Sequence, residues 1–205
     1  VVQCDREEAV VSIVITRIVP SAHLSRRQRQ EERRRLQQID TLSARLAELC
    51  SIAALLERAV QVVGAGWVQG AWFSVEAPAG QRTVAAYDLR LALDHPVIGA
   101  CLVGGVVQGA GGPAAARSQL VQRTLDLLWH TLRESPDQPV RWCPGPAVRQ
   151  GMLREMTRWN DDPRRTQKEV LDLLTAARHT ADVQRETCLT QQAVLADSGL
   201  CSSQT

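Results

Sequence analysis

The most regular pattern of apolar and polar positions begins at Thr166. Thr166 and Glu169 have the spacing of a capping box, in which each side chain accepts a hydrogen bond from the backbone amide of the other residue. An apolar stripe then recurs at helical spacing and comprises Val170, Leu173, Leu174 and Ala177. The sequence therefore predicts a helix that starts at Thr166 and buries this stripe.

A longer apolar seam lies in the first third of the chain. Its positions alternate spacings of three and four residues, as in a heptad repeat, and they are Ile39, Leu42, Leu46, Leu49, Ala53, Leu56, Val60 and Val63. Such a seam packs against another helix of its own domain or against a second chain. We favour packing within the domain for residues 49–63 and keep residues 39–46 as a candidate contact for self-association. Gly64 and Gly66 are expected to end the helix.

Shorter patterns predict the remaining elements. Residues 118–132 and a segment starting at Gly145-Pro146 are expected to be helices, separated by a proline-rich loop. The expected apolar stripe of the second of these helices is Val148, Met152, Met156 and Trp159. Residues 66–75 are typical of a short strand or tight loop, and residues 78–81 of a turn. The apolar, small side chains of residues 98–107 suit a closely packed helix or strand.

Together these patterns predict a mainly α protein. We expect a small bundle of about four helices with a short extended or hairpin element, preceded by a long amphipathic helix. Residues 1–24 are expected to be an extended segment, with a strand at 10–19, that need not belong to the native domain. An arginine-rich helical extension over residues 25–48, capped by Ser25, precedes a single helical domain at 49–184. Residues 185–205 are expected to be a flexible tail.

The composition narrows the classes of function. The chain has 205 residues and a formal net charge of +2, so any basic binding surface must be local. Aromatic residues make up only 3%, which argues against a module that stacks nucleic-acid bases on rings. Six widely spaced cysteines in a chain of this size favour reduced thiols and a cytoplasmic location. The apolar run at 9–19 is shorter than the roughly 18 residues of a membrane span, so no membrane partner is expected.

A local basic surface lies at the start of the seam helix. It comprises Arg26, Arg27, Arg29, Arg33, Arg34 and Arg35. Such a helix can bind the phosphates of nucleic acid in a salt-dependent way. Glu31 stands four residues from both Arg27 and Arg35, and pairs of this kind also suit a solvated helix face. Nucleic-acid binding is therefore kept as an alternative function.

The sequence contains few signals of catalysis or metal binding. Paired cysteines and the zinc-binding His-Glu-x-x-His pattern are absent from the sequence, and the glycine-rich segment 104–112 lacks the residues of a phosphate loop. Asp94, His95 and Cys101 contain the groups of an activated thiol nucleophile, but a buried structural cysteine is the commoner role. We therefore expect no metal ion and no cofactor, and we lean against an enzyme.

Two tryptophans stand beside polar residues: Trp67 is close to Gln69, and Trp159 precedes Asn160 and Asp161. An aromatic wall with a few convergent polar atoms can hold a ligand. The same residues can instead fill the core, with the Asn and Asp side chains bonding the backbone of a turn. Both interpretations stay open at this point, and a pocket near Trp159 and Cys101 would be the site of an enzyme.

Three motifs in order carry a resemblance to a known family. They are Gly66-Trp67-Val68-Gln69-Gly70, Ala100-Cys101-Leu102-Val103-Gly104-Gly105, and Trp159-Asn160-Asp161-Asp162-Pro163 followed by Arg165-Thr166 and Glu169-Val170. The chain resembles the actinobacterial and phage-associated domain of unknown function 6197 over roughly residues 49–181. The resemblance implies a small intracellular domain, in which the matching positions have no assigned roles. Those positions are Trp67, Gln69, Cys101, Trp159, Asn160 and Asp161. The arginine-rich extension and the insertion between Pro113 and Pro144 depart from the family's compact form.

The leading hypothesis is a non-catalytic protein-interaction or regulatory module that associates with a protein partner or with itself through the seam from Ile39 to Val63. Nucleic-acid binding through the arginines of residues 26–35 is the alternative. An enzyme with a pocket near Trp159 and Cys101 is the second alternative. A fold alone does not choose among these functions.

Overall fold

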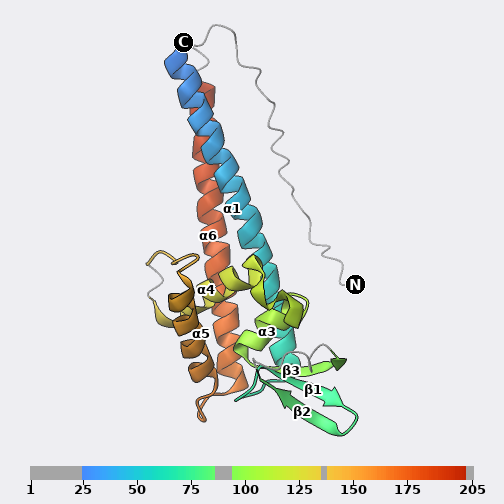
Figure 1. The fold of residues 1–205 in the computed structure, drawn as a ribbon. Coiled ribbons are helices and arrows are strands. Elements are labelled where there is room, and N and C mark those ends of the chain that lie inside the picture. The colour runs from blue at the N-terminus through green and yellow to red at the C-terminus, as the bar shows by residue number, and fades with distance from the viewer. Residues whose placement is uncertain (1–24, 86–93, 135–137, 202–205) are drawn as a thin grey trace. The chain divides into compact units, whose positions relative to one another are not determined.

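The computed structural model describes residues 25–85, 94–134 and 138–201. The strand predicted at residues 10–19 lies outside these ranges. The chain divides into two compact units, residues 1–38 and residues 39–205. Helices dominate the described residues, as predicted, and a small antiparallel sheet accompanies them (Figure 1).

Helix α1 spans Arg26–Ala65. It begins behind Ser25, whose hydroxyl accepts a hydrogen bond from the backbone amide of Gln28 at 3.2 Å. The amide of Ser25 donates to the Gln28 side chain at 2.8 Å, which completes a capping box. The helix ends just before Gly66, as predicted, whereas Gly64 still lies within it.

Within residues 39–205, α1 is the central element of the core. Its fully buried residues are Leu49, Ile52, Leu55, Leu56, Ala59 and Val63. Packing of residues 49–63 inside the domain is therefore confirmed. The buried face differs from the predicted seam. It also includes Ile52, Leu55 and Ala59, whereas the seam residues Ala53 and Val60 are only half-buried. A helix that contacts neighbours over a broad face needs an apolar stripe wider than a two-position heptad seam.

The sheet consists of β1 (Phe73–Ala77), β2 (Gly80–Val84) and β3 (Val97–Ala100) in the order β2-β1-β3. β1 and β2 form a hairpin in which Ala77 pairs with Gly80, so the predicted turn at 78–81 is confirmed. The pairing of β1 with β3 shifts register between Ser74 and Val75. A parallel bridge between Trp67 and Ala100 ties the segment after α1 to the end of β3.

Helix α3 (Leu102–Gly109) follows β3 directly. The apolar segment 98–107 is therefore partly strand and partly helix. A side-chain carbon added at Gly104 would collide with the backbone carbonyl of Trp72, and one added at Gly105 would lie 2.6 Å from the side chain of Val63. Glycine at these positions lets α3 pack directly against the start of the sheet and against α1, which confirms the predicted close packing.

Three elements complete the body of the second unit: the 3-10 helix η1 (Pro113–Arg117), α4 (Gln119–Arg133) and α5 (Pro146–Asn160). Both α helices lie where they were predicted, and α5 starts at its proline. Met152 and Met156 are buried as expected, whereas Val148 is 47% exposed. The prediction for Val148 is wrong because burial on α5 begins one turn later, at Met152.

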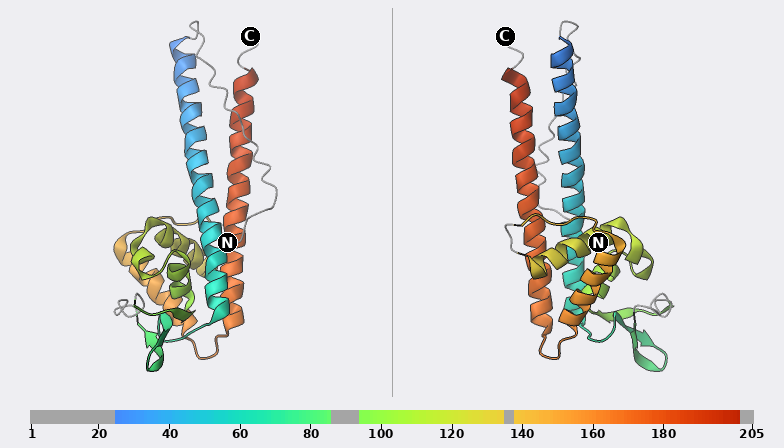
Figure 2. Two further views of the ribbon diagram at one scale, coloured as in Figure 1. Left: turned by 90° about the vertical axis from the view of Figure 1, so that its right-hand side faces the viewer. Right: turned by 60° about the vertical axis from the view of Figure 1, so that its left-hand side comes forward.

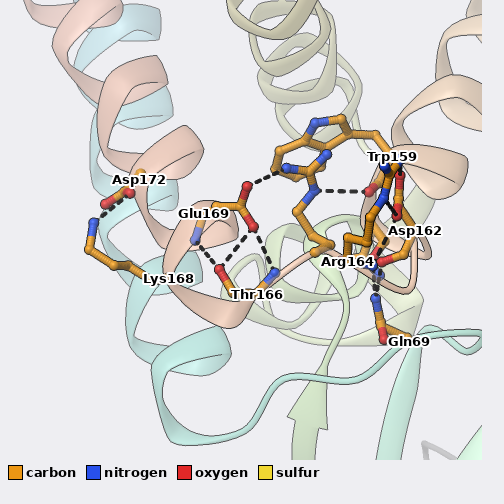
Figure 3. Close-up of polar contacts among 10 residues, drawn as sticks. Gln69, Trp159, Asp162, Arg164, Thr166, Lys168, Glu169 and Asp172 are labelled. Carbon is orange, nitrogen blue, oxygen red and sulfur yellow. Dashed lines mark hydrogen bonds and ion pairs between the residues drawn. The ribbon is translucent and has the colours of Figure 1, made fainter.

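Helix α6 spans Gln167–Cys201 and starts at the predicted capping box (Figure 3). The amide of Glu169 donates to the Thr166 hydroxyl at 3.3 Å, and the amide of Thr166 donates to the Glu169 carboxylate at 2.8 Å. The predicted apolar stripe from Val170 to Ala177 is buried. A flexible tail was expected over residues 185–205, but α6 continues through this segment as far as Cys201 and buries Cys188.

Residues 39–65 of α1 and helix α6 run side by side in opposite directions (Figure 2). Polar contacts join the two helices along their length. Gln167 donates to the carbonyl of Val63 at 2.7 Å, Arg178 pairs with Glu57, Arg45 donates to Gln184 at 3.3 Å, and Gln192 donates to Ser43 at 2.8 Å. We call residues 39–65 of α1 together with α6 the α1–α6 pair. In the described ranges, no helix is both long and apolar enough to cross a membrane.

Candidate functional site

Asn160 lies at the centre of the six residues that the sequence singled out. It is the last residue of α5 and is 1% exposed. Three segments meet around it: the loop at residues 67–70 after α1, the first residues of α3, and the turn between α5 and α6. The structure thus brings Trp67, Gln69, Cys101, Trp159, Asn160 and Asp161 into one region of the fold.

The side-chain amide of Asn160 uses its full hydrogen-bonding capacity within the protein. Its oxygen accepts from the indole nitrogen of Trp67 and from the backbone amide of Leu102, each at 3.0 Å. Its nitrogen donates to the carbonyl of Val68 at 3.2 Å and to the carboxylate of Asp161 at 2.8 Å. An amide offers two donors and two principal acceptor positions, so these four bonds occupy the group.

Gln69 and Asp161 bind the loop after α1 to the turn before α6. The Gln69 side chain donates to the carbonyl of Asn160 at 2.9 Å and to that of Asp162 at 2.8 Å (Figure 3). The carboxylate of Asp161 accepts from the backbone amide of Gly70 at 3.0 Å. Backbone amides and carbonyls in both segments lie outside helices and sheets. Each segment supplies side chains that form hydrogen bonds with these backbone groups of the other segment.

Trp159 forms the outer wall of this turn and carries a cation on its face. The guanidinium of Arg165 lies 4.0 Å from the centre of the Trp159 ring, and its Nε donates to the Trp159 carbonyl at 3.2 Å. The same guanidinium donates to Glu169 at 2.7 Å (Figure 3). The stacking and the capping box are thus linked through Glu169, whose pKa is lowered by the amide of Thr166 and by Arg165.

Two neighbouring residues fix the backbone of the turn. Asp162 accepts from the amide of Arg164 at 2.9 Å, and this hydrogen bond is the main reason that the pKa of Asp162 is lowered. Bonding between an Asp side chain and the amide two residues later is typical of a turn. The turn is therefore held by its own side chains as well as by the loop at residues 67–70.

Cys101 is the N-cap of α3 and lies in the core, 2% exposed. Its sulfur accepts a hydrogen bond from the amide of Gly104 at 3.3 Å. Burial raises the pKa of this thiol to about 11, so the nucleophilic thiolate is scarce at neutral pH. No hydrogen bond in the described residues connects Asp94 or His95 with Cys101, so the elements of an activated thiol are not assembled.

These contacts favour a structural role for the cluster. Asn160 joins three segments and keeps no free hydrogen-bonding atom for a ligand, and Cys101 acts as a helix cap. Across the described ranges, no three His, Cys, Asp or Glu side chains gather in a way that could hold a metal ion.

The arginines predicted to bind nucleic acid lie on the first turns of α1. Arg26, Arg27, Arg29, Arg33 and Arg34 are exposed. Arg35 differs, because its side chain is only 18% exposed and pairs with Glu32 at 2.8 Å. Arg27 pairs with Glu31 at 3.0 Å, but both side chains remain largely in solvent.

A second polar cluster, which the sequence did not predict, is centred on Asp126 of α4. The Asp126 side chain is 1% exposed and accepts from Arg149 at 2.9 Å and from the backbone amide of Cys143 at 2.9 Å. Bonding to Asp126 raises the pKa of Arg149. The cluster anchors the proline-rich segment before α5 onto α4. Its only signal in the sequence is the carboxylate of Asp126 between two leucines that are also buried.

Comparison with known proteins places the chain in a family without assigning it an activity. Neither a curated protein nor a solved structure matches the chain. Residues 49–180 match a family described as a family of unknown function, DUF6197. This match contains the loop at 67–70, the start of α3 and the α5–α6 turn that surround Asn160. Because the matched residues are well over half of the chain, the protein belongs to the DUF6197 family.

Proposed function

We propose that this protein is a non-catalytic interaction module that self-associates through the α1–α6 pair. The proposal rests mainly on a stripe of uncharged residues along the outer face of α6. Their spacings of four and three residues are those of a heptad seam, and the residues are Ala176, Thr180, Val183, Thr187, Thr190 and Val194. We call them the α6 stripe.

The α6 stripe is uncharged and largely accessible, with Thr180 half-buried and the other five residues exposed. Val183 is 47% exposed and Val194 is 60% exposed. The hydroxyls of Thr180, Thr187 and Thr190 each donate to a carbonyl one turn earlier, at 3.0 Å. Because these donors are satisfied inside the helix, a partner helix can cover the threonines without leaving a buried hydroxyl unpaired.

A hollow beside the stripe supplies the complementary shape. It has a volume of about 370 Å³ and is lined by Leu42, Arg45, Gln184, Thr187, Cys188 and Gln191. Leu42 belongs to the part of the α1 seam that the sequence left available for self-association, whereas Leu49, Leu56 and Val63 are buried within the domain. A ridge next to a groove is self-complementary, because two copies related by a two-fold axis can each place the ridge in the other's groove.

The structural role of the cluster around Asn160 supports a non-catalytic function. The Asn160 side chain forms its hydrogen bonds with other groups of the protein, and Cys101 is a protonated, buried thiol. Cysteines 50, 101, 143 and 188 are free thiols, which supports a reducing compartment, and we place the protein in the cytoplasm.

Light scattering over a range of protein concentrations tests self-association. We expect the wild type to form a dimer of the 22.5 kDa chain and Val183→Glu to shift it to the monomer, because a buried, unpaired carboxylate disfavours the contact. Val148→Glu is the matched control, since Val148 on α5 has the same 47% exposure outside the stripe and should leave the dimer intact. A wild type that stays monomeric, or equal loss of the dimer in both variants, would refute association through this stripe.

A further inference from the structure

We propose that the first turns of α1 bind the phosphate backbone of double-stranded nucleic acid through one arginine face. The inference concerns residues 26–35 only and does not depend on self-association through α6. We define the arginine face as Arg26, Arg27, Arg29, Arg33 and Arg34, the exposed arginines of this segment.

Helical geometry separates these five arginines from the acidic residues. At about 100° per residue, Arg26, Arg29 and Arg33 fall within an arc of about 60°. Arg27 and Arg34 extend this arc to about 160° on one side. Glu31, Glu32 and Arg35 lie on the remaining surface. Charges that alternate along the sequence are thus sorted into a cationic face and a face that contains both carboxylates.

The arginine face is largely free of internal neutralisation. In the part of the chain that the structure describes, no ion pair involves Arg26, Arg29, Arg33 or Arg34. The pair between Arg27 and Glu31 has side chains that are 89% and 60% exposed, and such a pair contributes little in water. These cations are therefore available to an external anion.

The position of the face at a helix N-terminus strengthens its attraction for anions. The backbone amides at the start of a helix carry a partial positive charge, and acidic residues usually offset it. The first turn of α1 has no acidic residue, and the capping box uses the neutral Gln28. The arginines add to the positive end of the helix instead of compensating it, and a polyanion would relieve this repulsion.

The composition of the segment selects nucleic acid among polyanions. Its cations are all guanidinium groups, which bind phosphate oxygens in a bidentate manner. Residues 26–35 contain no apolar side chain, so the helix lacks the face that an interfacial helix inserts into a membrane. They also contain no aromatic side chain, which favours contact with the backbone of a duplex over stacking on single-stranded bases.

The dimensions of the face fit a duplex. Arg26 and Arg33 are seven residues apart, which corresponds to about 10 Å along the helix. Duplex DNA carries one phosphate charge per roughly 1.7 Å of its axis, so a stretch of that length presents about six charges. Five arginines on one face can therefore contact several phosphates at once, without reading the base sequence.

The test measures binding of the full chain to a random-sequence DNA duplex as salt concentration rises. The face variant carries Arg26→Gln, Arg29→Gln and Arg33→Gln. The matched control carries Arg117→Gln, Arg154→Gln and Arg158→Gln, which removes the same charge from exposed positions elsewhere. We expect the wild type to bind, with the logarithm of affinity falling against the logarithm of salt with a slope of up to about −4.5 for five contacts. The face variant should lose about 2.7 of that slope, and the control should keep it.

Three outcomes would overturn the proposal. The first is absence of duplex binding by the wild type at about 50 mM salt, where phosphate contacts are strong. The second is an equal loss of binding in the face variant and in the control, which would assign the effect to net charge. The third is binding to vesicles containing phosphatidylserine without binding to the duplex. Helical circular dichroism and thermal unfolding of each variant establish that α1 and the domain remain folded.

Discussion

The indole of Trp67 donates a hydrogen bond to the side chain of Asn160 across 93 residues of sequence, at 3.0 Å. The same Asn160 oxygen accepts from the amide of Leu102 at the start of α3. One buried amide therefore fixes the loop after α1, the start of α3 and the end of α5 relative to one another. This relationship gives the tryptophan and asparagine motifs of the sequence a shared physical role.

Replacement of Asn160 by Ala should lower the free energy of unfolding by about 2–4 kcal/mol, because it leaves the half-buried indole of Trp67 and the buried amide of Leu102 without an acceptor. Urea unfolding followed by circular dichroism measures this loss. Arg158→Ala on the exposed side of the same helix is the control and should change stability by less than about 0.5 kcal/mol. A loss below about 1 kcal/mol for Asn160→Ala would contradict the structural role.

Two glycines should respond to alanine in opposite directions. Gly104→Ala should destabilise the protein by about 1–3 kcal/mol, because the added methyl group collides with the backbone of Trp72. Gly151→Ala in the middle of α5 meets nothing within 4 Å and should stabilise the helix by about 0.5–1 kcal/mol. Thermal unfolding of the two variants compares them directly. Equal effects at both positions would contradict the close approach of α3 to β1.

The parts of the fold that were predictable depend on local signals. Two helices begin where the sequence predicts a cap, at Ser25 and at Thr166, because capping involves residues only three apart. Helix α5 begins at its proline, which is also a local signal. The helix after Arg185 was not predicted because its inward-facing positions do not repeat as an apolar stripe. Among the described side chains after Arg185, Cys188 is buried and Gln192 is half-buried, and these two do not form an apolar stripe. Gln192 faces inward because Ser43 of α1 lies beside it.

The sequence indicated which residues form the candidate site but not which hydrogen bonds they make. Trp67, Cys101 and Asn160 belong to the three ordered motifs of the sequence, and they lie close together in the structure. Their roles depend on hydrogen bonds between segments that are 58 and 93 residues apart, and spacing along the chain carries no information about such bonds. Asp126 was missed for the same reason, because its partners Cys143 and Arg149 come from a later loop and helix.

His130 should make the protein less stable in mild acid. Burial lowers the pKa of His130 below 6.5, so the unfolded chain binds a proton that the folded chain resists. The unfolded state therefore holds more protons as pH falls through 6.5, and the free energy of unfolding decreases in that direction. Unfolding between about pH 7.5 and pH 5.5 should show a smaller decrease for His130→Gln than for the wild type. His179→Gln, at an exposed position of α6, should retain the wild-type decrease, and identical behaviour of the two variants would refute the assignment.

Cys101 should be inert to mild alkylation in the folded protein. Its pKa of about 11 leaves about one thiolate in a thousand at pH 8, and the sulfur is buried. Cys50 and Cys143 are exposed and serve as internal standards, with labelling sites mapped by mass spectrometry. We expect iodoacetamide to modify both before Cys101, and all three in urea. Labelling of Cys101 as fast as Cys50 would contradict the buried cap and revive a thiol-based enzyme.

The same thiol should make the folded state sensitive to alkali. Between about pH 9 and pH 11 the unfolded chain releases the Cys101 proton while the folded chain retains it, so the free energy of unfolding falls as pH rises. The cost over that window is on the order of 2–3 kcal/mol. Cys101→Ser keeps a capping oxygen for Gly104 but does not titrate there, so the difference in stability between wild type and this variant should shrink or reverse at high pH. A difference that stays constant from pH 8 to pH 11 would show that Cys101 titrates equally in both states and would contradict its burial in the folded protein.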